Sequence, residues 1–219
     1  MRIKETKVYE YAELSDDAKA KVRDWYREIT AGSNDFAEFI TSDFQETLKA
    51  LGFDTREKDI SWSGFWSQGN GAAFAGNWRA SNCDPAALLA DRPPTWGHTD
   101  GVPTPCPSNV ELHRIAAEIL ACKAAGMTYA AISQSRRGFF MSLDSSDHGE
   151  PDEATIAEWN ALHAEQAETS ERLITAARDL AHAFYRALEA EYEYQNSDEQ
   201  VAEAIEANEY EFTEYGERA

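Results

Sequence analysis

The sequence predicts an α+β fold: an antiparallel sheet built from hairpins, packed under helices, with a long C-terminal helix. Residues 60–78 and 127–143 each hold two short strand-like segments joined by a turn, which is the pattern of a hairpin. Helical apolar spacing then continues from about residue 154 to residue 192. The resulting order, β-α-α-β-β-α-β-β-α-α-β, lacks the steady βα alternation of a parallel sheet.

The N-terminal quarter predicts one strand and two helices. Residues 6–13 alternate polar and apolar side chains, as a strand does. Ser15 is a good N-cap for a helix that ends near Gly32. The expected inward face of this helix is Ala18, Val22, Trp25 and Ile29. A second helix should start at Asn34–Asp35 and end before Gly52. Its expected inward face is Phe36, Phe39, Ile40, Phe44, Leu48 and Leu51.

The middle and the end of the chain predict a loop, three helices and a last strand. Residues 81–107 are rich in proline and predict a long loop with one helical turn at 86–90. Ser108 is expected to cap a helix over 110–125, and Ser197 one over 198–207. Residues 209–215 predict a final strand. We interpret 1–219 as a single domain with an acidic C-terminal segment at 189–219.

Composition excludes several classes of protein. The chain has 42% hydrophobic residues and 11% aromatic residues, enough for a core without disulfides or a metal. Its net charge of −20 argues against direct binding to nucleic-acid phosphates and to anionic membranes. Three cysteines are an odd count, which favours a reducing cytoplasm. The charged N-terminus lacks the apolar stretch of a signal peptide, and no window predicts a membrane span.

The negative charge is concentrated at the end of the chain. Residues 151–219 hold 18 acids and 4 arginines, and from Glu189 onward there are 11 acids against Arg218 as the one base. A disordered tail would lack large apolar side chains. This segment contains several of them: Tyr192, Tyr194, Val201, Ile205, Tyr210, Phe212 and Tyr215. We therefore expect a folded acidic surface.

Three stretches resemble an uncharacterised family of phage- and prophage-encoded proteins that are sometimes labelled antitoxin-like. They are residues 8–19 (VYEYAELSDDAK), which precede a Trp-containing helix, residues 63–72 (SGFWSQGNGA) and residues 207–214 (ANEYEFTE). The resemblance implies a gene of a phage or mobile element and action on a host or phage macromolecule. It supplies no catalytic residues.

The turn at 67–71 has two interpretations. Gly69 and Gly71 suit a backbone N–H cradle for an anion, but no Lys or Arg flanks them. They also suit a tight hairpin that needs φ > 0, which is the interpretation that we favour. An enzyme with a site near this turn stays open as an alternative. Trp66, Gln68 and Asn70 form a secondary candidate surface.

Metal and nucleophile signatures are weak. Cys83, His98, Cys106 and His113 lack the paired spacing that pre-forms half of a zinc site. Cys122 falls on the apolar face of a helix and predicts a core position. No Gly-x-Ser-x-Gly motif is present, and residues 144–150 lack the spacing of an EF-hand. We predict no metal, no cofactor and no catalysis.

The strongest functional signal is the acidic end of the chain. Glu199, Glu203 and Glu206 recur at i, i+4 and i+7 on one helix face, and bases that would offset them are nearly absent after Arg186. Such a row resembles the charge of a nucleic-acid backbone. The candidate partner-binding residues are Glu189, Glu191, Glu193, Asp198, Glu199, Glu203 and Glu206.

These observations favour a phage-encoded, cytoplasmic binding protein. It would inhibit a nucleic-acid-handling defence protein, such as a CRISPR effector or a restriction enzyme, by occupying its basic surface as a nucleic-acid mimic. An antitoxin-like protein that neutralises a basic toxin is the first alternative, and the small enzyme is the second. In the two binding hypotheses the partner is a basic protein.

Overall fold

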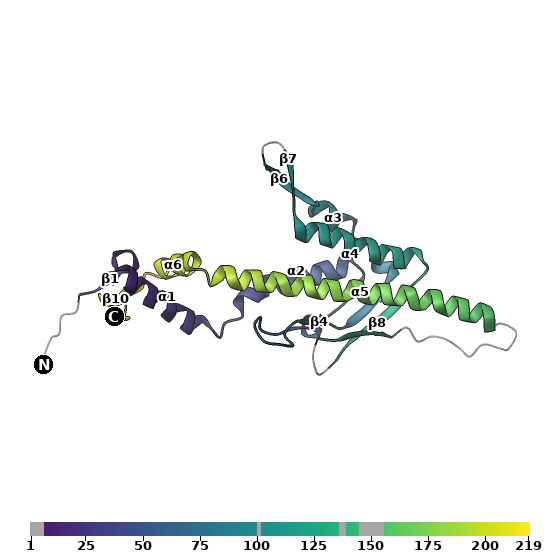
Figure 1. The fold of residues 1–219 in the computed structure, drawn as a ribbon, viewed down its shortest axis with the longest axis horizontal. Helices are drawn as coiled ribbons and strands as arrows, with labels where there is room; N and C mark the ends of the chain where they lie inside the picture. Colours follow the sequence, from purple (N-terminus) through teal and green to yellow (C-terminus); the bar gives the residue numbers. More distant parts are fainter. Residues whose placement is uncertain (1–6, 100–101, 136–138, 145–155) are drawn as a thin grey trace. The chain divides into compact units, whose positions relative to one another are not determined.

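The computed structural model describes residues 7–99, 102–135, 139–144 and 156–219 (Figure 1). It confirms the α+β class, with helices, antiparallel strands and a long C-terminal helix. The contacts divide the chain into unit 1 (Met1–Glu38 and Leu188–Ala219) and unit 2 (Phe39–Ala187). Helices α2 (Asp35–Ala50) and α5 (Ile156–Gln195) contribute residues to both units. The single domain over 1–219 stays a prediction.

Unit 1 joins the two ends of the chain. Strand β1 (Tyr9–Glu10) pairs antiparallel with β10 (Glu211–Phe212), and the short 3₁₀ helix η1 (Tyr11–Glu13) follows β1. Helices α1 (Asp16–Thr30) and α6 (Asp198–Ala207) begin at the predicted caps. The Ser15 hydroxyl accepts from the N–H of Ala18, and the Ser197 hydroxyl from that of Gln200. These bonds satisfy donors that a helix start otherwise leaves free.

The core of unit 1 combines residues from both ends of the sequence. Seven buried side chains form it: Tyr11, Leu14, Ala18, Val22, Val201, Ile205 and Phe212. The Trp25 ring packs edge-on against Phe212, with ring centroids 5.8 Å apart. Ile29, which was expected to face inward, is instead 54% exposed, so that part of the prediction is wrong. The last buried residue of α1 is Val22, about two turns before the helix ends at Thr30.

Both terminal strands are shorter than predicted. The strand expected over 6–13 covers only Tyr9–Glu10 in the described part, because Glu13 turns the chain into η1 by accepting from the Glu10 N–H at 2.9 Å. The strand expected over 209–215 covers only Glu211–Phe212. Glu209 has φ +51°, a left-handed conformation that interrupts an extended strand.

Unit 2 is built on a four-stranded antiparallel sheet of order β2-β5-β8-β9. Its strands are β2 (Phe53–Asp54), β5 (Gly76–Arg79), β8 (Tyr129–Gln134) and β9 (Met141–Asp144). The β8–β9 pair confirms the predicted second hairpin. Phe53, Trp78 and Ala130 lie side by side on one sheet face and are buried. The Trp78 indole N–H donates to the Leu51 carbonyl at 3.0 Å, which ties this face to the end of α2.

The first predicted hairpin is confirmed with different bounds. Strands β3 (Ile60–Trp62) and β4 (Ala72–Phe74) pair antiparallel, and a short 3₁₀ helix, η2 (Glu57–Asp59), precedes them. The strand expected over 72–78 is divided into β4 and β5, which belong to different sheets. The division lies at Ala75, whose N–H donates to the carbonyl of Asp59 and so extends the β3–β4 register by one residue, before β5 begins at Gly76.

The proline-rich segment 81–107 is more ordered than the predicted loop. It contains the 3₁₀ helix η3 (Ala80–Asn82) at its start, the expected helix α3 (Ala86–Asp91), and strands β6 (Thr95–Thr99) and β7 (Val102–Pro105). Pro103 and Pro105 are tolerated in β7 because a two-stranded ribbon has unpaired edges. The next helix, α4 (Pro107–Ala124), is capped at Cys106 and not at Ser108. Pro107 takes the first helical position, where no N–H is needed.

In the described residues, the α-helices α2, α3, α4 and α5 lie in unit 2 wholly or in part, and α2, α4 and α5 supply most of its buried helical side chains. Phe44 of α2 stacks on Phe184 of α5, with ring centroids 4.3 Å apart. Phe39 was expected to face inward and is 76% exposed. It lies outside the stripe that runs through Phe36, Phe44 and Leu48 on the same helix. No helix in the described ranges is long and apolar enough to span a bilayer.

Candidate partner-binding surface

Helix α6 presents the predicted row of glutamates to solvent. Val201 and Ile205 are buried in the core of unit 1, and Glu199, Glu203 and Glu206 are exposed on the other side. Apolar burial on one side therefore fixes which way the row faces. The Gln200 amide donates to Glu203 at 3.1 Å, a neutral partner that leaves the negative charge in place. Among the described residues, the structure gives Glu199 and Glu206 no basic partner.

Asp198, at the start of the same helix, is neutralised. Arg27 Nη2 lies 2.5 Å from Oδ1 of Asp198, and Arg23 Nη2 lies 3.1 Å from Oδ2. The pKa of Asp198 is lowered, mainly by the hydrogen bond from Arg27. Asp198 is one of the candidate partner-binding residues, but its carboxylate, unlike those of Glu199 and Glu206, has basic partners in the structure. The two arginines come from α1, far away in the sequence. They therefore offset Asp198 although bases are nearly absent from the chain after Arg186.

The acids at the end of α5 do not share one face. Glu189 and Glu193 are four residues apart and lie on one side, but Glu191 lies on the opposite side. Glu191 also accepts from the Gln195 amide at 2.8 Å. Glu189 and Glu191 are half-buried, and Glu193 is exposed. The seven candidate residues thus form an exposed row on α6, a neutralised Asp198 and a divided set on α5.

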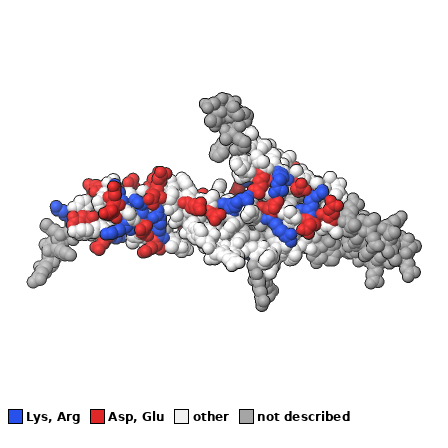
Figure 2. Space-filling model, viewed as in Figure 1, with Lys and Arg blue, Asp and Glu red and all other residues white. Residues whose placement is uncertain are grey.

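Unit 1 as a whole is strongly acidic. Its residues comprise 20 acids and 8 bases. Glu10 and Glu211 lie directly opposite each other across the β1–β10 pair, an arrangement of like charges that destabilises a ribbon. Arg218, the one base of the C-terminal segment, lies over the Tyr210 ring at 4.2 Å. In Figure 2, acidic side chains of unit 1 lie around a smaller set of basic ones.

The secondary candidate surface lies in the loop between β3 and β4. Trp66 is 70% exposed, and Gln68 is exposed. Asn70 is half-buried and accepts a hydrogen bond from the Ser63 hydroxyl at 3.1 Å, so it holds the loop together. Gly69 has the expected positive φ of 91°, whereas Gly71 is absent from the residues with positive φ, which corrects that half of the prediction.

Comparison with known proteins assigns a family. A model described as Domain of unknown function (DUF8835) matches residues 36–198. The chain belongs to the DUF8835 family. No curated protein and no solved structure matches it. The DUF8835 match includes all of unit 2, whereas α1 and nearly all of α6 lie outside it.

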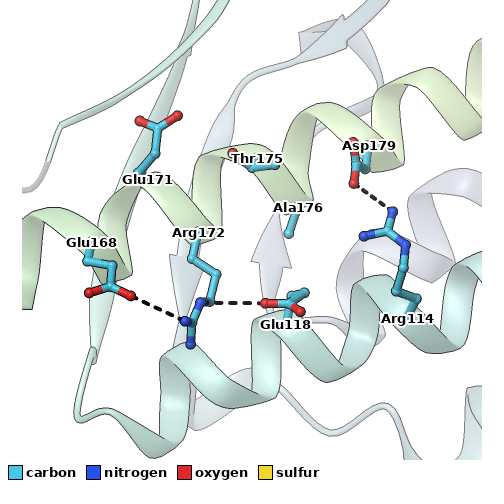
Figure 3. A pocket seen from close by; sticks show the side chains of 8 residues that line it. All are labelled: Arg114, Glu118, Glu168, Glu171, Arg172, Thr175, Ala176 and Asp179. Atoms are coloured by element: carbon cyan, nitrogen blue, oxygen red, sulfur yellow. Dashed lines mark hydrogen bonds and ion pairs between the residues drawn. The ribbon is translucent and has the colours of Figure 1, made fainter.

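Within the DUF8835 range, a groove of about 340 Å³ lies between α4 and α5 (Figure 3). Its lining consists mainly of ion pairs. Arg114 lies 2.6 Å from Asp179, and Arg172 lies 3.5 Å from both Glu118 and Glu168. The hydrogen bond to Asp179 raises the pKa of Arg114. Arg114 and Arg172 each pair with a carboxylate of the other helix, so the described lining of the groove offers no free cation to a ligand.

This set of ion pairs is not among the features that the sequence predicts. The positions Arg114 and Glu118, like Glu168 and Arg172, are four residues apart, a spacing typical of charge pairs along one helix. Glu168 and Arg172 do pair in that way. Arg114 and Arg172 also reach across to the other helix, and that partnership has no sequence signal.

The cysteines of the DUF8835 range have contrasting environments. Cys83 and Cys122 are buried, which confirms the core position of Cys122, and burial raises the pKa of both thiols. Cys106 is half-buried at the start of α4, and a hydrogen bond from Ser108 is the main cause of its lowered pKa. His113 Nε2 lies 2.9 Å from the Arg92 carbonyl.

The same residues bear on the zinc hypothesis. The side chain of His98 lies outside the described residues. In the part of the chain that the structure describes, no three His, Cys, Asp or Glu side chains are grouped to hold a metal ion.

Proposed function

We propose that this chain is a phage- or mobile-element-encoded binding protein that inhibits a nucleic-acid-handling defence protein of the host. The target would be of the class of CRISPR effectors or restriction enzymes. The acidic surface of unit 1 would occupy the basic channel in which the target holds nucleic acid. The resemblance of residues 8–19, 63–72 and 207–214 to phage-encoded proteins supports the origin, and the charge of unit 1 supports the mode of action.

The observation that carries the proposal is the exposed row of Glu199, Glu203 and Glu206. Along a helix, steps of four and three residues rise by about 6 Å and about 4.5 Å. A nucleic-acid strand carries one phosphate per ~3.4 Å of axis, so the two charge spacings are of the same order. Burial of Val201 and Ile205 holds the row in place before any partner arrives. Such preorganisation lowers the entropic cost of binding.

The buried side of α6 explains how this helix can stay folded although it carries a row of unneutralised carboxylates. Like-charge pairs at i,i+4 cost a helix a few tenths of a kcal/mol each. Burying Val201 and Ile205 returns roughly 1.5–3 kcal/mol per side chain. The apolar side of the helix therefore stabilises it enough to keep the carboxylates unneutralised. These charges would speed encounter with a basic partner through long-range attraction.

A pull-down from bacterial host lysate tests the proposal. The bait is the full chain, compared with the triple variant Glu199→Gln, Glu203→Gln and Glu206→Gln. A matched control removes three exposed acids of unit 2 through Glu46→Gln, Glu57→Gln and Asp91→Asn. Both variants change the net charge equally, so a difference between them reports position and not total charge.

The expected result is a basic protein that is captured by the parent chain and by the control but weakly by the triple variant. Raising NaCl from about 50 to about 500 mM should release it, because the Debye length falls to a few ångströms. Capture that ignores both salt and the triple substitution would contradict the proposal. Equal loss in the two variants would contradict a role for the α6 row.

A further inference from the structure

A cavity of about 230 Å³ lies in unit 2, lined by residues of α2, α4 and α5 and by Arg92 at the end of α3. Most of its described lining is apolar: Ile40, Phe44, Leu112, Ile115, Leu180 and Phe184. An engineered apolar cavity of about 150 Å³ is large enough to bind benzene. The cavity of unit 2, named the α2–α4–α5 cavity below, therefore has room for an aromatic ring with a small polar substituent.

The α5 side of the α2–α4–α5 cavity combines small and aromatic residues. Ala183 and Ala187 are one turn apart, and their short side chains leave space between the helices. Phe184 stacks on Phe44 of α2, with ring centroids 4.3 Å apart and an angle of 9° between the ring planes. Both rings are buried, so this wall is fixed before a ligand arrives. An aromatic ligand gains more from packing beside such rings than from burial alone.

The polar part of the lining is held in place by its own contacts. Arg92 forms an ion pair with Asp43 through Nη2 and donates from Nη1 to the Thr47 hydroxyl at 3.3 Å. The backbone of Arg92 is fixed as well, because its carbonyl oxygen lies 2.9 Å from Nε2 of His113 on α4. A polar ligand would therefore meet groups that are already positioned, which lowers the entropic cost of binding.

Two atoms of this polar lining keep unused hydrogen-bonding capacity. Thr47 is only 5% exposed, and in the described part of the chain its hydroxyl accepts from Arg92 but has no acceptor for its own hydrogen. Asp43 binds Arg92 through Oδ1, and no described donor contacts Oδ2. A buried hydroxyl without an acceptor is unfavourable. The cavity thus offers one donor and one acceptor, four residues apart on the same side of α2.

We propose that the α2–α4–α5 cavity is a binding site for a small, neutral aromatic amide. The ring lies among the phenylalanines, the carbonyl of the ligand accepts from the Thr47 hydroxyl, and its N–H donates to Asp43 Oδ2. A neutral ligand fits because the charges of Arg92 and Asp43 offset each other. An anion would meet both Asp43 and a chain with a net charge of −20. This proposal does not rest on the proposed function.

Titration of the isotope-labelled full chain with benzamide, followed through its amide chemical shifts, tests the proposal. Benzamide at up to about 20 mM should shift resonances of α2, α4 and α5, with a dissociation constant of about 1 mM or less. Toluene supplies the ring without the amide, and benzoate replaces the amide with an anion. Benzoate should bind about tenfold more weakly than benzamide or worse, because it brings a charge into an apolar cavity.

Thr47→Val tests the polar contact, because it removes the hydroxyl at similar volume. It should weaken benzamide binding about tenfold and leave the affinity for toluene unchanged, since toluene makes no hydrogen bond to Thr47. Thr47→Ser keeps the hydroxyl and is the matched control, which should retain its affinity for benzamide within about threefold. Thermal unfolding of each variant shows that the fold is retained.

Ala183→Phe tests the location of the site. A ring placed in the cavity should abolish binding of benzamide and of toluene. The matched control is Ala167→Phe, at an exposed position of the same helix, which should change neither affinity.

Several outcomes would overturn the proposal. They are a chain that benzamide does not shift, benzoate that binds as tightly as benzamide, and benzamide binding that survives Ala183→Phe. A Thr47→Val variant that binds benzamide like the parent chain, or that loses benzamide and toluene equally, would overturn it too. The pull-down above depends on α6 and not on this cavity, so the two proposals fail separately.

Discussion

Arg27 and Asp198, 171 residues apart in the sequence, connect the α1 helix to the start of α6. One guanidinium nitrogen of Arg27 lies 2.5 Å from Asp198 Oδ1, and its Nε donates to the Asn196 carbonyl at 3.1 Å. Arg23 contacts the other carboxylate oxygen and also donates to the Tyr11 hydroxyl at 2.9 Å. The two arginines therefore hold the point at which the acidic helix begins.

Replacing Arg27 with alanine should destabilise unit 1. The substitution removes the hydrogen bond to the Asn196 carbonyl, and a net hydrogen bond is worth about 1 kcal/mol. Urea unfolding followed by circular dichroism measures the change in the free energy of unfolding. Lys21→Ala, at an exposed position of the same helix, is the control and should change it by less than about 0.5 kcal/mol. Equal effects of the two variants would show that the connection adds no stability.

The pair also predicts a pH dependence. Arg27 lowers the pKa of Asp198 below its ordinary value of 3.8 in the folded chain. Such a carboxylate stabilises the fold above its unfolded pKa, and the stabilisation is lost as pH falls through the folded pKa. The difference in unfolding free energy between the parent chain and Asp198→Asn should therefore be largest near neutral pH and shrink below about pH 4. A difference that is constant from pH 7 to pH 3 would contradict this assignment.

Removing the α6 row should leave folding unharmed. Glu199→Gln, Glu203→Gln and Glu206→Gln keep helix propensity close to its original value. They also relieve like-charge repulsion, which should raise the free energy of unfolding by a few tenths of a kcal/mol. Thermal and urea unfolding at low salt measure it. A loss of more than about 1 kcal/mol would mean that the glutamates have structural partners, and the row would no longer be a free surface.

Two glycines with positive φ should respond differently to alanine. At Gly52, φ is 92° and an added Cβ would lie 2.9 Å from the Arg79 carbonyl oxygen and from Cys83 Cβ. Gly52→Ala should therefore cost about 2–4 kcal/mol, from backbone strain and overpacking together. At Gly69, φ is 91° with open space around it, so Gly69→Ala should cost about 1 kcal/mol. Urea unfolding of both variants checks the order, which the reverse result would contradict.

The three thiols should react at different rates. Cys106 is half-buried with a lowered pKa, whereas Cys83 and Cys122 are buried with raised pKa values. Because the thiolate is the reactive form, iodoacetamide at about pH 7.5 should alkylate Cys106 first, by a factor of ten or more in rate. Peptide mass spectrometry locates the modification. Unfolding in guanidinium is the control and should bring the three rates together.

Local signals in the sequence determined most helices and both main hairpins. The Ser15 and Ser197 caps, the apolar spacing of α5 and the glycine after α2 each act within one or two helical turns. Such interactions are visible in a short stretch of sequence because the backbone geometry of a helix fixes which residues meet. For the same reason the exposed side of α6 could be predicted from Val201 and Ile205 alone.

Tertiary contacts decided what local spacing leaves open. Helical periodicity predicts that Phe39 and Ile29 are buried. Both are exposed, because burial also requires a neighbouring element on that side of the helix. The β6–β7 ribbon is not predicted by the sequence, because its prolines favour a loop. A strand tolerates proline only where its edge is unpaired. The division of 72–78 between two sheets depended on the partner strands, because β4 pairs with β3 whereas β5 pairs with β2 and β8.

The candidate surface divides in the same way. The sequence by itself determined that the end of the chain is acidic, that it is folded, and that Glu199, Glu203 and Glu206 share a face. Only the tertiary structure decided that Asp198 is neutralised, since Arg23 and Arg27 reach it from the other end of the chain. Charge is set by composition, but its neutralisation depends on distance in space, and sequence separation does not determine that distance.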